Sequence, residues 1–104
     1  MIAALALLMA ACPVLSPAPG GELMPEVQTR FVAAIARIRA VHPGESVAIF
    51  SHGDVIRSAV AYFAGVPLDL FLRLEIRPAS ISSVRLYDDW LQILGINDTG
   101  RLYA

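Results

Sequence analysis

Lysine is absent from this sequence of 104 residues, cysteine occurs once and histidine twice, and each scarcity narrows the range of functions. Cys12 has no partner for an intrachain disulfide, and one cysteine with two histidines does not support a zinc site. The eight basic residues are all arginine, which suits bidentate pairing with carboxylate or phosphate. Because the net charge is only −1, nothing indicates a nucleic acid or a membrane surface as a partner. We expect neither a metal nor a cofactor.

Long hydrophobic runs are also missing, apart from residues 1–11. This run is too short to span a membrane as a helix. Together with Cys12 it resembles a secretory signal with a lipoprotein cleavage box, but no lysine or arginine precedes it. We therefore interpret residues 1–18 as an apolar, loose segment, which is either a helical remnant or an artificial start in a longer reading frame. The expected location is the cytoplasm.

The stretch around His52 carries the chemistry of the chain. Val47–Phe50 is apolar and partly β-branched, which indicates a short strand buried in a parallel sheet. His52 and Gly53 follow where that strand should end, and Asp54 suits the N-cap of a helix. The carboxyl ends of strands in open α/β sheets bind ligands, and a helix N-terminus attracts anions such as phosphate. The pattern alone leaves a second interpretation open, in which His52 is an ordinary loop or core residue.

Helical and strand periodicities predict the remaining elements. Apolar residues at helical spacing predict a helix from Pro25 to about Val41 and another from Asp54 to about Ala64, which Gly65 ends. The later part of the chain predicts, in order, a helical turn at 68–71, an extended segment at 73–77, and strands at 82–86 and 90–96 joined by a hairpin at 88–89. No internal repeat or second domain is visible.

Several short motifs follow one another in a specific order. They are Ser-His-Gly at the end of the strand, Val-Ile-Arg at the helix start, then Gly-Val-Pro-Leu-Asp, Pro-Ala-Ser and a late Asn-Asp. In this order they resemble the C-terminal half of the histidine phosphatase superfamily, in its phosphoglycerate-mutase-like branch. The resemblance covers roughly residues 19–102. It implies phosphoryl transfer from small phosphate esters through a phosphohistidine. His52 would be the second active-site histidine, which contacts the phosphoryl group, with Gly53 beside the phosphate.

The nucleophile of that family is missing. It lies in an Arg-His-Gly motif on the first strand, and this chain contains no Arg-His pair. The only other histidine, His42, is followed by Pro43 and Gly44, which is typical of a surface turn. The acid of the family, carried by a loop in its first half, has no match either. The chain therefore resembles half of an active site.

The resemblance also implies an α/β fold, a three-layer sandwich with a mixed, mainly parallel sheet that lacks the family's N-terminal half. Residues 19–104 would form the C-terminal part of this domain. The strand at 47–50 would lack a neighbour, expose a backbone edge, and be apolar on both faces. Three remedies fit: self-association through the exposed edge, folding of the amino-terminal run over the gap, or low stability.

Two further groups have competing interpretations. Arg57 is either a phosphate ligand or the partner of a carboxylate such as Asp54 or Glu75, and we favour the ion pair. The Asn97-Asp98 pair either belongs to the functional end of the sheet, as the resemblance implies, or caps a turn with its side chains.

Three functions follow from these observations. The first is a phosphatase or mutase for a small phosphorylated molecule, truncated here and inactive alone, so that the chain's own status as an enzyme is uncertain. The second is a non-catalytic phosphate-binding or interaction module of the same fold. The third, and the least favoured, is an exported fragment that carries a lipid anchor at Cys12.

Overall fold

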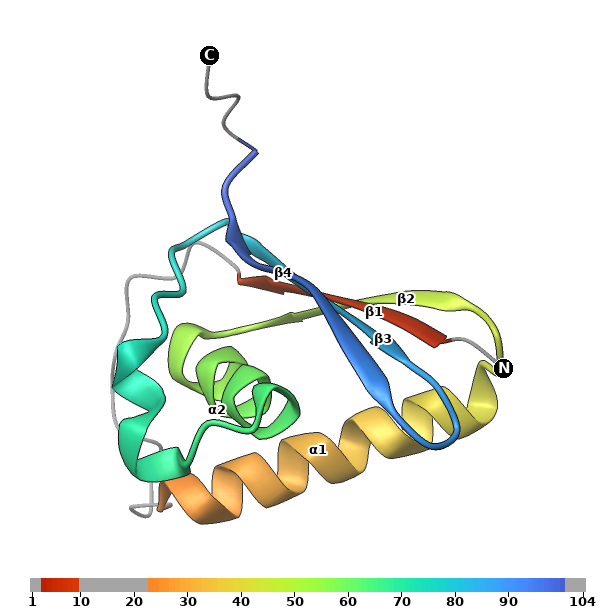
Figure 1. The fold of residues 1–104 in the computed structure, drawn as a ribbon, viewed down its shortest axis with the longest axis horizontal. Coiled ribbons are helices and arrows are strands. Elements are labelled where there is room, and N and C mark those ends of the chain that lie inside the picture. The colour runs from red at the N-terminus through yellow and green to blue at the C-terminus, as the bar shows by residue number, and fades with distance from the viewer. Residues whose placement is uncertain (1–2, 10–22, 101–104) are drawn as a thin grey trace.

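The structure, a computed structural model, describes residues 3–9 and 23–100, which form a sheet with helices packed against it (Figure 1). The elements in chain order are β1 (Ala3–Met9), α1 (Met24–Val41), β2 (Ser46–Ser51), α2 (Gly53–Ala64), the 3-10 helix η1 (Leu68–Arg73), β3 (Ile81–Leu86) and β4 (Leu91–Asp98). The predicted helices, hairpin and central strand are confirmed to within a few residues. Of the segment 73–77, which was predicted to be extended, Arg73 belongs to η1 and residues 74–77 form no strand, although Ile76 is buried between two exposed neighbours.

The four-stranded sheet has the order β2-β1-β3-β4. β1 runs parallel to β2, with Ala6 opposite Ala48, whereas the β1–β3 and β3–β4 pairs are antiparallel. The prediction of a mainly parallel sheet is therefore wrong for the residues described. The reason lies in the connections, because the short hairpin between β3 and β4 can only join antiparallel strands.

Within the amino-terminal run, residues 3–9 form a strand and not the helical remnant that we expected. β1 lies between β2 and β3 and provides each of them with a pairing partner. It thereby supplies one neighbour for the strand that carries the Ser-His-Gly motif. Residues 10–22, which include Cys12 and the predicted boundary between 18 and 19, lie outside the described part of the chain.

One face of the sheet carries the core. α1 and α2 both lie on this face (Figure 1), and side chains of β2, β3 and β4 meet them there. Gln28 Nε2 donates a hydrogen bond of 2.8 Å to the carbonyl oxygen of Ser58 and so joins the two helices. The core residues that are buried are Phe31, Ile35, Ile56, Ala59, Val60, Ile76, Val84 and Leu86.

The opposite face of the sheet is uncovered among the residues described. Phe50 is 66% exposed and Leu94 49% exposed, although both lie within strands of the sheet. The third layer of the predicted sandwich is thus not present in this part of the chain. β2 also stands at an edge of the described sheet, as predicted. Pairing of that edge with a second copy stays a prediction.

Candidate active site

His52 lies at the carboxyl end of β2 and immediately before α2. Its backbone is extended, with φ −111° and ψ 160°, and its carbonyl oxygen accepts the first helical hydrogen bond, from Ile56 N at 2.9 Å. His52 is therefore the N-cap residue, and the predicted N-cap, Asp54, lies in the first turn instead. The imidazole is exposed and makes no hydrogen bond or ion pair with the described residues. It is placed to meet a ligand from solvent.

The first turn of α2 offers backbone donors next to that imidazole. The amide groups at the start of a helix have no partner within the helix, and His52 does not cap them with its side chain. Gly53 is the first helical residue and is buried. A glycine has no Cβ, so it permits a ligand to approach the backbone closely. The positive end of the helix dipole adds to these donors. The geometry suits a small anion.

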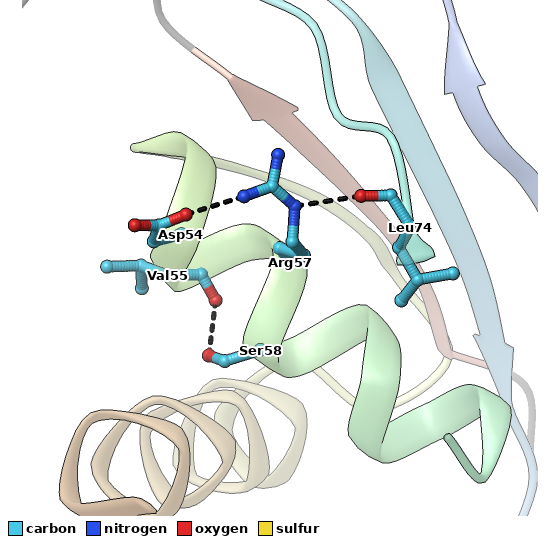
Figure 2. A network of polar contacts seen from close by, with 5 residues as sticks. All are labelled: Asp54, Val55, Arg57, Ser58 and Leu74. Carbon is cyan, nitrogen blue, oxygen red and sulfur yellow. Dashed lines mark hydrogen bonds and ion pairs between the residues drawn. The ribbon is translucent and has the colours of Figure 1, made fainter. Parts of the chain in front are cut away.

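Arg57 is engaged within the protein (Figure 2). Its Nη1 donates to Asp54 Oδ1 at 2.6 Å, and its Nε donates to the carbonyl oxygen of Leu74 at 2.8 Å. The guanidinium also lies 5.9 Å from the centroid of the Phe71 ring. The predicted ion pair with Asp54 is confirmed, whereas Glu75 pairs with Arg77. Arg57 therefore joins the first turn of α2 to the segment before β3, and it also neutralises the carboxylate of Asp54, two residues after His52.

A groove of about 230 Å³ runs beside the end of β2, on the helical side of the sheet. Ser51 and Val55, which flank His52 and Gly53 in the sequence, line it together with Arg30 of α1. Arg30 is a basic residue near the site that the sequence patterns did not single out. Arg30 and Ser51 are far apart in the sequence, and only the packing of α1 beside the end of β2 brings them to one groove.

The end of the sheet at which His52 lies has two further unusual features. The hydroxyl of buried Ser80 has no hydrogen-bond partner in the described part of the chain, and Ala79 before it has a positive φ of 61°. Backbone strain of this kind costs about 1–3 kcal/mol and often occurs at functional sites. In the sheet register, Ile81 lies opposite Leu8, and Leu8 lies opposite Phe50. Ser80 and His52 therefore lie at the same end of the sheet. Sequence reasoning gave Ser80 no role.

Asn97 and Asp98 lie at the same end of the sheet, on β4, but their side chains bind backbone N–H groups of neighbouring turns. Asn97 Oδ1 accepts a hydrogen bond of 2.8 Å from Arg77 N, and Asp98 Oδ1 accepts one of 2.9 Å from Gly100 N. Two strands separate β4 from β2, which corresponds to roughly 14 Å between their backbones. Of the two interpretations, the structure supports the capping role and keeps this pair away from His52.

His42 occupies the other end of β2. Its Nδ1 lies 2.9 Å from Glu45 Oε2 in the exposed turn between α1 and β2. The six residues of β2 separate it from His52, a distance of roughly 20 Å. The structure therefore keeps the two histidines apart. This agrees with the sequence, which placed His42 in a surface turn.

Residues 3–9 and 23–100 contain no group of three or more histidine, cysteine, aspartate or glutamate side chains that could hold a metal ion. In the same part of the chain, no helix is long and apolar enough to cross a membrane.

Comparisons with known proteins agree with the motifs around His52. The family model described as histidine phosphatase superfamily, branch 1, matches residues 7–99. Among solved structures, YhfR from Bacillus stearothermophilus is 27% identical, with a TM-score of 0.71 over 77% of this chain. Comparison with curated protein sequences finds no match.

Two more solved structures share the fold at lower identity. A mutant phosphoserine phosphatase from Entamoeba histolytica, in complex with phosphoserine, is 10% identical, with a TM-score of 0.69 over 78% of the chain. An Escherichia coli K-12 protein described as an alpha-ribazole-5'-P phosphatase is 18% identical, with a TM-score of 0.63 over 76% of the chain. The matched part spans 40%, 41% and 39% of YhfR and these two chains, respectively.

Proposed function

The chain belongs to the histidine phosphatase superfamily, and we propose that it supplies the phosphoryl-contacting part of a site that cleaves small phosphate esters through a phosphohistidine. In this proposal His52 donates a proton or hydrogen bond to the phosphoryl oxygens, and the N–H group of Gly53 contacts one of them. The α2 N-terminus then stabilises the negative charge that develops in the transition state.

The observation that carries the proposal is the position of His52. It is an exposed imidazole, without a partner among the described residues, at the carboxyl end of a strand and beside an uncapped helix start. Such a group can neutralise charge on a transferring phosphoryl group in its protonated form. The order of the family motifs around it gives this placement its chemical meaning.

We propose further that the 104 residues alone lack the nucleophile. Phosphoryl transfer through a covalent intermediate needs a group held in line with phosphorus. The proposal is supported by the absence of an Arg-His pair from the sequence, and by His42 pairing with Glu45 at the far end of β2. That the matched part spans about two fifths of the solved relatives also supports it.

The substrate class follows from the fold's relatives only as a proposal. Two of the solved structures carry names of enzymes for small phosphorylated molecules, phosphoserine and alpha-ribazole-5'-P. A small phosphate ester is therefore the class that we propose, with no nucleic acid and no membrane as partner. The cytoplasm remains the proposed location.

A non-catalytic phosphate-binding module is the second candidate, because the anion-binding features at His52 and Gly53 do not depend on a nucleophile. The reading frame immediately upstream distinguishes the two candidates. An in-frame Arg-His-Gly motif there would indicate a truncated enzyme, and its absence would favour the binding module. The lipid-anchored alternative depends on Cys12, which lies outside the described residues.

The test is a turnover assay on the purified 104-residue chain with a generic aryl phosphate. We expect no turnover, because the sequence contains no Arg-His pair and His42 lies at the far end of β2 from His52. If the chain turned over the substrate, lost this activity in His52→Ala and carried acid-labile phosphate, the proposal that it lacks the nucleophile would be contradicted. Titration of the chain with inorganic phosphate should shift the Gly53 amide resonance, with a dissociation constant on the order of millimolar.

A further inference from the structure

A second cavity lies at the other end of the sheet from His52. Its volume is about 650 Å³, and it is formed by the C-terminal part of α1, the end of α2 and the hairpin between β3 and β4. Volumes of this size are typical of sites for small molecules. Pro43 and Gly44, which precede β2, line it, whereas His52 follows β2. The cavity is thus separate from the proposed phosphate site.

Aromatic side chains form much of its wall. Tyr62, Phe63 and Trp90 line it, and Tyr62 is 54% and Trp90 56% exposed. Trp90 stacks on Tyr87 with centroids 4.5 Å apart and planes at 5°, and Tyr62 meets Phe63 edge to face at 5.4 Å. Each exposed ring is therefore held by a neighbouring ring and still presents apolar surface to the cavity. Tyr62 is therefore available to a ligand.

The rim of the cavity carries more acid than base. Arg39 Nη2 lies 3.5 Å from Asp88 Oδ1, so this arginine is already paired. Asp89 also lines the cavity and makes no hydrogen bond or ion pair with the described residues. One carboxylate beside exposed aromatic rings therefore has no cation paired with it among the described residues. Both the carboxylate and the ring faces attract a positive charge.

We propose that this cavity binds a small molecule that combines an aromatic ring with an ammonium or amidinium group. The ring of the ligand packs against Trp90 and Tyr62, and its cation approaches Asp89. A ligand of the same shape with a carboxylate or phosphate group is disfavoured by the carboxylate of Asp89. This site is independent of the proposed phosphatase function, so each can fail without the other.

Trp90 is the single tryptophan of the chain, so its fluorescence reports on this cavity. The two probes are phenethylamine and phenylpropionate, which share a phenyl ring and a two-carbon linker but carry opposite charges. For ligands of this size we expect phenethylamine to change the fluorescence saturably, with a dissociation constant on the order of millimolar. Phenylpropionate should bind more weakly, by up to about fivefold, because an exposed ion pair contributes up to about a factor of five.

Three variants locate the interaction. Asp89→Asn should weaken phenethylamine about threefold and leave phenylpropionate unchanged or tighter. Tyr62→Ala should weaken both probes, since it removes part of the aromatic wall. Asp69→Asn, which changes an exposed carboxylate on η1, is the matched control and should change neither. Equal binding of the two probes, no saturable change with either, or equal effects of the two Asp→Asn variants would overturn the proposal.

Discussion

The two ends of β2 carry the two histidines of the chain in opposite situations. At the carboxyl end, His52 is exposed, has no partner among the described residues and stands at the start of α2, which its side chain does not cap. At the amino end, His42 is also exposed, but Glu45 holds it at 2.9 Å in a turn. The comparison shows that exposure alone does not distinguish a candidate catalytic histidine. What distinguishes His52 is the helix start next to it, which can share the charge of a bound anion.

The largest effect that this contrast predicts is on catalysis. In a complete, active protein that contains this segment, His52→Ala should lower the rate of phosphoryl transfer by about two or more orders of magnitude, because a preorganised donor is lost. His42→Ala should leave the rate almost unchanged. Steady-state kinetics on both variants measure this difference. Equal sensitivity at the two positions would break the comparison.

Arg57→Ala tests whether the start of α2, where His52 lies, depends on the contacts of Arg57 with Asp54 and Leu74. The variant removes the hydrogen bond to the Leu74 carbonyl oxygen and the ion pair with Asp54, so unfolding should become easier by about 2 kcal/mol. It also leaves the Asp54 carboxylate unneutralised near the anion site, which should weaken phosphate binding. Urea denaturation and phosphate titration provide the two readouts.

Arg37→Ala is the matched control for this prediction, because Arg37 is an exposed arginine of α1. It should change stability by less than about 0.5 kcal/mol. If the two arginine variants were equally stable, the network around Arg57 would have no role in holding α2.

Gly65→Ala acts at the far end of α2 and should affect stability without affecting the anion site. Gly65 has φ 73° and closes the helix in the left-handed conformation, with open space around the position of a Cβ. The cost, about 1 kcal/mol, is therefore that of the backbone alone. Gly95→Ala in β4 also meets open space but has no positive φ, so its effect should stay within about 0.5 kcal/mol. Thermal unfolding of both variants measures the two losses of stability. A larger loss for Gly95→Ala than for Gly65→Ala would contradict the prediction.

The smallest expected effect is at the His42 end. His42→Ala removes an exposed pair with Glu45, and such pairs contribute about 0–1 kcal/mol. We expect a change in unfolding free energy of less than about 0.5 kcal/mol in urea denaturation. A loss above about 2 kcal/mol would show that this turn is more than a connection between α1 and β2.

Local patterns were sufficient for much of the fold and for the candidate residue. Apolar spacing predicted α1 and α2, Gly65 predicted the end of α2, and the strand before Ser-His-Gly was predicted from its β-branched apolar residues. These features depend on neighbours within a few positions along the chain. The structure places His52 at the carboxyl end of a strand and at a helix start, as the pattern indicated.

The errors concern contacts between distant parts of the chain. Residues 3–9 are rich in alanine and leucine, which favour a helix locally, but pairing with β2 and β3 makes them a strand. The direction of those pairings decided that the sheet is not mainly parallel. Arg30 comes near the end of β2 through the packing of α1, and Ser80 lies at the same end of the sheet through the register of β3. No spacing in the sequence indicates either position.

The most direct test of the central claim is a phosphate titration that follows both imidazoles in one sample. The chain has only two histidines, so their ring proton resonances can be assigned with the two His→Ala variants. At constant pH, with chloride as the control at equal ionic strength, phosphate should shift the His52 resonances saturably, with a dissociation constant on the order of millimolar. The His42 resonances should follow the chloride control. Equal phosphate shifts at both histidines, or none at His52, would contradict the assignment of the anion site to the carboxyl end of β2.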